Sequence, residues 1–221
     1  MNKKILTGVL SLIVLSAGCA HLPIKDVSPL DVRSVMDDFQ GRLGNKYEIL
    51  DSVEFKIGLF SFSSLGVTSI DLINDHLAVA GVTPVGITLF SVVADKGKVT
   101  KSFVMPQFAK RGDVAKAVSG NIRDIYFDLT PKSFMSGFSQ GDKLSVKTFV
   151  ENGIHFEYIF SLKDQVLCEK RLYKNSRIFW RIYYSNWSAD LSGHIHPGNI
   201  RFVHRAYRYQ LIINAKEVRP F

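Results

Sequence analysis

Cysteine is scarce in this sequence: its 221 residues include only Cys19 and Cys168. Two cysteines cannot supply the disulfide framework of a small secreted domain. Cys168 stands in an apolar-flanked run with no neighbouring base, which is typical of a small buried hydrophobe rather than of a catalytic thiol. We therefore expect neither a disulfide scaffold nor cysteine catalysis.

The sequence also lacks a His-Glu-x-x-His motif and a phosphate-cradling glycine loop. His194 and His196 are the only close histidine pair, and Pro197-Gly198 indicates a loop there. We expect surface histidines, no metal, no cofactor and no enzymatic activity. A histidine metal pair and an acyl-transferring enzyme remain as alternatives.

The apolar run at residues 5–15 is too short to cross a bilayer. Lys3 and Lys4 precede it, which is the layout of a secretory signal peptide. The small residues that lead to Cys19 resemble the bacterial lipobox, which implies cleavage after residue 18 and acylation of Cys19. Ser16 stands where the lipobox usually has Leu, so a plain secretory signal is the alternative. Because Ala20 is not Asp, we expect an outer-membrane location, with the protein lipid-anchored and facing the periplasm.

The chain is basic. Without Lys3 and Lys4, 26 Lys and Arg residues stand against 20 Asp and Glu residues, a net charge of +6. Outside the cytoplasm we expect no nucleic-acid partner. Attraction to anionic lipid head groups is one interpretation, and a solvated basic surface without a specific partner is the other.

The domain organisation follows from these segments. Residues 1–18 are expected to be the signal peptide, 19–29 a lipidated tether, and 30–221 a single domain. Ser28 and Pro29 predict a helix start, apolar residues continue at helical spacing through Leu30, Val32, Val35, Met36 and Phe39, and Gly41 ends it.

From Tyr47 the pattern changes to strands joined by turns, so we expect an antiparallel meander. Turns are predicted at residues 63–66, 74–75, 95–98 and 152–153, and a loop is predicted around Gly137 and Gly141. Later strands are predicted at residues 144–150, 154–162, 166–173, 177–185 and 202–214. One helix interrupts the meander within residues 106–128, capped by Asp113, with Val114, Ala117, Val118, Ile122, Ile125 and Leu129 on its apolar side.

Several strands are apolar on both faces, so the sheet must be covered on both sides or curl around something. The many aromatic residues favour a hydrophobic ligand cavity, and an ordinary filled core is the alternative. The expected lining residues of the cavity are Phe55, Val79, Phe90, Phe103, Phe156, Tyr158, Phe160, Trp180, Ile182 and Tyr209.

The stretch from Leu77 to Val93 predicts a β-hairpin whose turn is Thr83, Pro84, Val85 and Gly86. The apolar Val85 at its apex indicates a membrane-insertion or partner-docking tip. Alternatively, Val85 folds back onto the core.

The order of elements and the segment from Val79 to Val92 resemble the LolA/LolB-like lipoprotein carriers. Residues 81–86 also resemble the Gly-Leu-Thr-Pro-Leu-Gly pattern of uncharacterised bacterial lipoproteins encoded among fatty-acid-synthase-like and aryl-polyene genes. The resemblance implies a mainly β (α+β) fold, a single curved antiparallel half-barrel with helices covering an apolar concave face. It also implies that Val85 stands where LolB has a protruding leucine used in delivery to the membrane.

Two functions remain open. The first is an outer-membrane lipoprotein that binds or accepts an acyl-bearing cargo (lipid, polyene lipid or lipoprotein) and assists its delivery. Its partners would be outer-membrane lipid, the cargo and a periplasmic carrier, and the protein would be a monomer. The second is an assembly module that docks through the hairpin tip and the basic surface.

Overall fold

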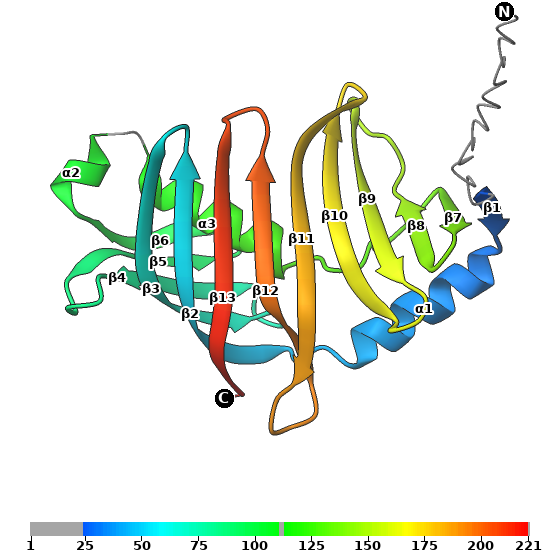
Figure 1. Ribbon diagram of the computed structural model, residues 1–221, viewed down its shortest axis with the longest axis horizontal. Coiled ribbons are helices and arrows are strands. Elements are labelled where there is room, and N and C mark those ends of the chain that lie inside the picture. Colours follow the sequence, from blue (N-terminus) through cyan, green and yellow to red (C-terminus); the bar gives the residue numbers. More distant parts are fainter. Residues whose placement is uncertain (1–23, 111–112, 221) are drawn as a thin grey trace, which may run out of the picture.

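The computed structural model describes residues 24–110 and 113–220, which form one open antiparallel sheet and three helices (Figure 1). The thirteen strands follow the order β1-β7-β8-β9-β10-β11-β12-β13-β2-β3-β4-β5-β6. The helices are α1 (Pro29–Gly41), α2 (Pro106–Ala109) and α3 (Val114–Tyr126). The strands are β1 (Ile24–Val27), β2 (Lys46–Ile57), β3 (Phe60–Asp71), β4 (His76–Val82), β5 (Thr88–Asp95), β6 (Lys98–Val104), β7 (Ser136–Gln140), β8 (Lys143–Lys147), β9 (Ile154–Ser161), β10 (Val166–Lys174), β11 (Arg177–Ala189), β12 (Ile195–His204) and β13 (Tyr209–Pro220).

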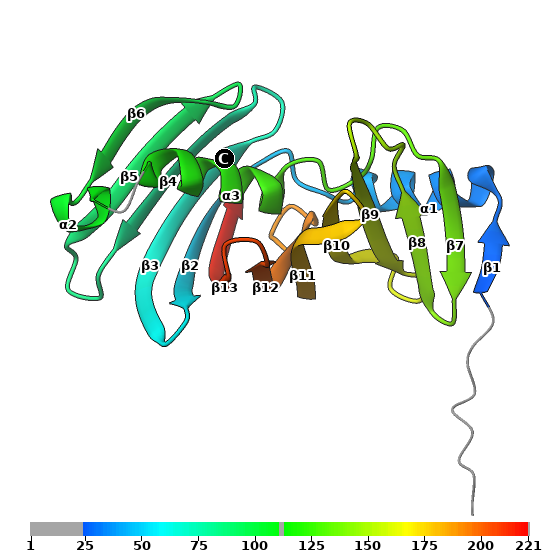
Figure 2. The same cartoon turned by 90° about the horizontal axis from the view of Figure 1, so that it is seen from above.

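The sheet curls strongly without closing, and α3 lies inside the curve (Figure 2). The expected curved antiparallel sheet with helices on its inner side is thereby confirmed. No helix in the described ranges is long and apolar enough to cross a membrane.

Helix α1 begins where the sequence predicts. The Ser28 hydroxyl accepts a hydrogen bond from the Asp31 backbone N–H, and Pro29 occupies the first turn. Its buried residues Val32 and Phe39 face the sheet, and the Phe39 ring meets Phe160 and Trp187 edge to face. This packing anchors the helix on the inner side of the sheet.

Helix α3 is capped by Asp113, whose carboxylate accepts from the Lys116 N–H at 3.0 Å. Ile122 and Ile125 are buried in the core, as expected. Ala117 was expected on the same side but is exposed, because the buried stripe runs through Ala115 and Ser119 instead.

Some strand boundaries differ from the sequence expectation. The turn predicted at residues 63–66 is wrong, because β3 runs through them and the chain turns at Gly58 and Leu59 instead. Gly66 is needed inside β3 because a methyl group there would overlap the buried carboxylate of Asp51.

The loop predicted around Gly137 and Gly141 is present at Gly141, in the turn between β7 and β8, but is wrong at Gly137. The loop predicted at Pro197-Gly198 is wrong. Gly137 belongs to β7, where a side chain would collide with Val32 of α1. Pro197 and Gly198 belong to β12, and Gly198 passes so close to the Asn186 carbonyl that a side chain would not fit. The strand predicted at residues 202–214 is two strands, β12 and β13, joined by a turn at residues 205–208.

Residues 24–27, within the range expected as a tether, form β1 and pair with β7. The hairpin predicted at Asn152-Gly153 is present, with both residues at positive φ.

Candidate functional site

A pocket of about 570 Å³ opens between the end of α3, the segment that follows it, and strands β9 and β10. The lining residues include the aromatic and apolar Phe127, Ile154 and Phe156. They also include the polar Asp124 and Lys170, and the Lys170 ammonium lies 5.8 Å from the Phe156 ring centroid. The volume lies in the range of about 300–1,000 Å³ typical of small-molecule sites. A cavity lined by both apolar and charged side chains suits an amphiphile.

Lys170 forms the floor of this pocket and is almost completely buried. Its Nζ donates hydrogen bonds to the carbonyl oxygens of Asp124 at 3.1 Å and Phe127 at 3.0 Å. These carbonyls lie at the end of α3, where intrahelical donors run out. The ammonium also lies within about 6 Å of the Phe156, Tyr158 and Trp180 ring centroids.

Burial controls the charge of this site. Desolvation lowers the pKa of Lys170 to about 8, against the opposing attraction of Asp124 and Asp128. Desolvation likewise raises the pKa of Asp124 to about 6, against the attraction of Lys170. Burial therefore disfavours the charged form of both groups.

Two tyrosines help to fix α3 over the sheet. Tyr184 of β11 is buried and donates its hydroxyl to the Ile125 carbonyl at 2.8 Å. Tyr209 of β13 donates to the Asn121 side chain at 2.7 Å. Together with Lys170, they tie the helix to three strands, so α3 forms a wall of the pocket that the sheet holds in place.

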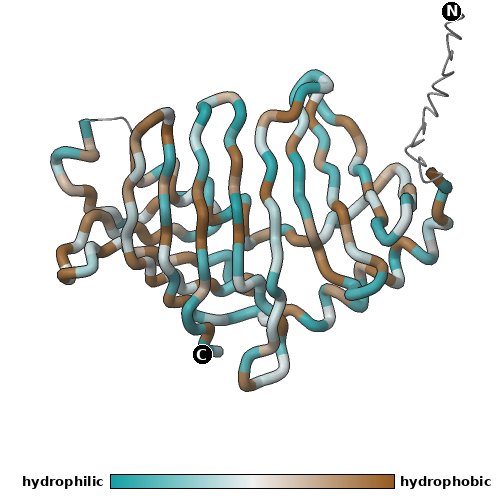
Figure 3. Tube along the Cα trace, in the orientation of Figure 1, coloured by the Kyte–Doolittle hydropathy of each residue, from teal (hydrophilic) through white to brown (hydrophobic). Residues whose placement is uncertain are grey.

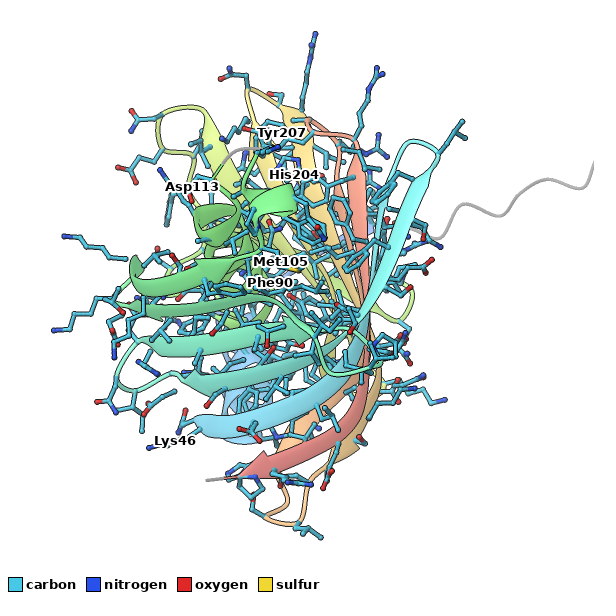
Figure 4. The ribbon with its side chains drawn as sticks, turned by 90° about the vertical axis from the view of Figure 1, so that its left-hand side faces the viewer. Lys46, Phe90, Met105, Asp113, His204 and Tyr207 are labelled. Atoms are coloured by element: carbon cyan, nitrogen blue, oxygen red, sulfur yellow. The ribbon has the colours of Figure 1, made fainter. Side chains whose placement is uncertain are left out.

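The ten residues expected to line a cavity separate into groups. Only Phe156 and Tyr158 line the pocket. Val79, Phe160, Trp180 and Ile182 are buried in the core. Phe90 and Tyr209 are half-buried and pack against it, and Figure 4 shows Phe90 inside the curve of the sheet. Phe55 is half-buried, and its ring centroid lies 5.5 Å from that of Tyr209.

Phe103 lies apart from the other nine. It pairs with Ser91, so it points to the face opposite Phe90, and half of its surface is exposed. The centre of the concave face is thus filled by the chain's own aromatic residues and α3, and the open space lies beside this centre.

The site contains residues that the sequence did not single out: Lys170, Asp124 and Phe127. A weak signal existed for Lys170, because it shares its face of β10 with the buried Leu172. No local pattern indicates that α3 would end above it.

No family model matches this sequence, and neither does any curated protein. Solved structures do match in fold. A LolA superfamily protein from Nitrosomonas europaea aligns with a TM-score of 0.56 and 11% identity, covering 86% of this chain and 93% of that one. A "putative outer membrane lipoprotein-sorting protein domain" from Vibrio parahaemolyticus gives 0.54 and 10%, covering 85% and 91%. A DUF1329 family protein from Desulfovibrio piger gives 0.53 and 7%, covering 88% and 94%.

The fold is LolA-like. At these identities the likeness concerns the fold alone, and no residue correspondence is drawn from it.

In this LolA-like fold, Thr83, Pro84, Val85 and Gly86 form the tight turn between β4 and β5. The Gly86 N–H donates to the Thr83 carbonyl at 2.9 Å, and Gly86 has a φ of +85°. Val85 is 82% exposed and does not fold back onto the core. Figure 3 shows hydrophobic residues in this turn, at the left of the molecule.

The sequence contains one pattern that is typical of serine hydrolases. Gly137 to Gly141 spell Gly-x-Ser-x-Gly, with Ser139 at the nucleophile position. That motif needs a sharp turn from a strand into a helix. Ser139 instead lies within β7, paired with Lys25 and Leu144, so the match carries no catalytic geometry.

The prediction of surface histidines is wrong for His196, which is buried within β12. Desolvation lowers the pKa of the buried His196, whose Nε2 lies 3.0 Å from the Asp190 carboxylate. Ser192 contacts both Asp190 and the His194 Nδ1. Among the described residues no group of His, Cys, Asp and Glu is arranged to hold a metal ion. Cys19, the expected lipidation site, lies outside the described residues.

Proposed function

We propose that this protein binds an acyl-bearing amphiphile in the pocket beside α3 and assists its delivery to the outer membrane. The observation that carries the proposal is the pocket itself, whose lining combines aromatic side chains for an acyl chain with charged side chains for a head group, in a LolA-like fold. The similar Vibrio domain is described as lipoprotein-sorting, which supports a lipoprotein or another acylated molecule as the cargo.

The remaining parts of the proposal come from the sequence. Residues 1–18 would be removed as a signal peptide, and Cys19 would be acylated. Of the expected tether at residues 19–29, the part before β1 would join this anchor to the domain, because residues 24–27 pair with β7. The protein would act as a monomer without a cofactor, and a periplasmic carrier would supply the cargo. We also propose membership in the lipoprotein family encoded among fatty-acid-synthase-like and aryl-polyene genes, on the pattern of residues 81–86.

Transfer needs no bond cleavage in this scheme. Each buried CH₂ of an acyl chain contributes roughly 0.8 kcal/mol, so a chain that is only partly enclosed is held firmly yet moves on to a more apolar site. Delivery would be helped by Val85, whose exposed side chain is available for contact with lipid.

One observation favours the second function, an envelope docking module. Val85 and Ile87 are both more than half exposed at the same turn, which leaves an apolar surface available to a protein partner. The two functions differ in whether the pocket must be occupied.

Titration with a fluorescent fatty-acid probe in the absence of membranes tests the proposal. Ser133 is exposed and lines the pocket, so Ser133→Trp would place an indole where the chain should lie. Excluding two methylenes costs about 1.6 kcal/mol, and we expect roughly 15-fold weaker binding. Ser63→Trp, at an exposed serine paired with Glu54 on β3 and outside the pocket, is the matched control and should leave binding unchanged. If neither the wild type nor the control variant binds the probe, the docking module is favoured.

A further inference from the structure

The turns that join consecutive strands from β7 to β13, and from β2 to β4, lie at the two ends of these strands. They therefore form two opposite edges of the sheet. Strand pairing places the loop at residues 148–153 and the turns at residues 175–176, 205–208 and 58–59 side by side on one of them, called here the upper edge. The turns at residues 72–75, 141–142, 162–165 and 190–194 lie on the opposite, lower edge. In Figure 1 the upper edge is at the top, and Figure 4 shows Tyr207 there and Lys46 at the bottom.

The two edges differ in charge. Counted with one flanking residue on each side, the upper-edge turns contain five Lys and Arg residues and one Glu. The lower-edge turns, counted in the same way, contain five Asp and two Lys residues. The turns of the upper edge therefore carry a net charge of +4, and those of the lower edge carry a net charge of −3.

Exposed apolar side chains lie among the cations of the upper edge. Leu59 is fully exposed, and Phe60 and Tyr207 are each about half exposed or more. Figure 3 shows the β2–β3 turn as hydrophobic and the β10–β11 turn as hydrophilic. A mixture of Tyr, aliphatic side chains and Lys or Arg is typical of surfaces that lie at the interface of a bilayer.

The β10–β11 and β12–β13 turns of the upper edge pack against each other. The Lys174 ammonium lies 3.9 Å from the Phe179 ring centroid, and the Phe179 and Tyr207 rings are 6.1 Å apart. The Arg205 N–H donates to the Phe179 carbonyl at 3.0 Å. The cations are thus presented by ordered turns that share contacts.

The pocket opens near the same edge. Phe149 and Asn152, which line it, belong to the loop of residues 148–153. A ligand entering past this loop would pass the upper edge first.

We propose that the upper edge docks on a bilayer surface that carries anionic head groups, with Leu59 and Tyr207 inserted among the head groups and Lys174, Arg177, Arg205 and Arg208 above them. The charge asymmetry fits one orientation only, since the lower edge would be repelled. Docking in this way brings the mouth of the pocket to the membrane.

Flotation with vesicles tests this docking, using residues 20–221, which contain every described strand and helix. Vesicles of phosphatidylglycerol and phosphatidylethanolamine are compared with vesicles of phosphatidylcholine alone. We expect binding to the former, weakening as salt is raised because the Debye length shortens, and little binding to the latter. Near-equal binding to both would overturn the proposal, and so would failure to bind either.

Two matched pairs of variants locate the contact. Arg205→Gln/Arg208→Asn removes two positive charges from the upper edge, and Lys143→Gln/Lys163→Gln removes two from the lower edge. At about fivefold for each charge, we expect roughly 25-fold weaker binding for the first and less than about twofold for the second. Leu59→Ser should weaken binding roughly fivefold, whereas Leu191→Ser, at an equally exposed leucine of the lower edge, should not.

Val85→Ser separates the upper edge from the β4–β5 turn. If Val85→Ser abolishes vesicle binding while the upper-edge variants bind normally, the membrane contact lies at that turn and the proposal is wrong. Vesicle binding by the upper edge does not require an occupied pocket, so its failure is distinct from a failure to bind the fatty-acid probe.

Discussion

The buried carboxyl group of Asp51 should make the stability of this protein fall as pH rises toward neutrality. Asp51 of β2 is only 2% exposed, and its Oδ1 has no hydrogen-bond partner within residues 24–110 and 113–220. Burial raises its pKa from 3.8 to about 7. The perturbation we propose is Asp51→Asn, which keeps the shape and removes the titration.

The sign and size follow from linkage. Between pH 3.8 and about 7 the folded protein holds a proton that the unfolded chain has released, so this contribution to stability declines as pH rises. At about 1.4 kcal/mol for each pKa unit, the wild type should lose about 4 kcal/mol of unfolding free energy over this window. The variant should not show this loss.

Urea unfolding of both proteins at several pH values from 4 to 8 measures the effect. The difference between the two curves is the quantity of interest, because other titrating groups then cancel. Asp37→Asn, at an exposed aspartate of α1, is the control and should run parallel to the wild type. Parallel curves for wild type and Asp51→Asn would refute the reasoning and mean that the carboxyl group finds a partner or water.

Three further outcomes are expected from the described contacts. Tyr184→Phe should destabilise the protein by about 1–2 kcal/mol in chemical unfolding, because the buried Ile125 carbonyl loses its donor. Burial lowers the pKa of Lys170 from 10.5 to about 8, so between these pH values the unfolded chain binds more protons than the folded protein. The unfolding free energy should therefore rise with pH in this window, by up to about 3 kcal/mol. This rise should be absent in Lys170→Met. Val85→Ser should change the unfolding free energy by less than about 0.5 kcal/mol, since the side chain is 82% exposed, and a larger loss would mean that Val85 supports the core.

The helices and many of the turns could be predicted because their signals are local. Ser28 with Pro29, and Asp113 before an amphipathic stretch, each fix a helix start within a few residues. The hairpin at Asn152-Gly153 is likewise encoded by two residues that tolerate positive φ.

The strand boundaries that the sequence predicted wrongly depend on contacts between distant segments. Gly66 and Gly137 resemble turn residues in the sequence, but each is a glycine because a side chain from elsewhere, of Asp51 or of Val32, occupies the space. The actual turn at Gly58 was hidden by the apolar residues around it, which mark the upper edge.

The sequence predicted a hydrophobic cavity but not its position in the fold. A hydrophobic cavity was expected at the centre of the concave face, yet Trp180 and Phe160 fill that centre themselves. The pocket arises where α3 ends over Lys170, and this depends on the crossing of a helix over a strand about 45 residues away in the chain. Side-chain identity alone does not contain that information.

Native mass spectrometry of the full-length protein purified from the cells that produce it tests the central claim most directly. We expect the wild type to carry one non-covalent acyl-bearing molecule per chain, and Ser133→Trp to lose it while Ser63→Trp keeps it. Repeated recovery of an empty wild-type protein that also takes up no added fatty-acid probe would contradict the account.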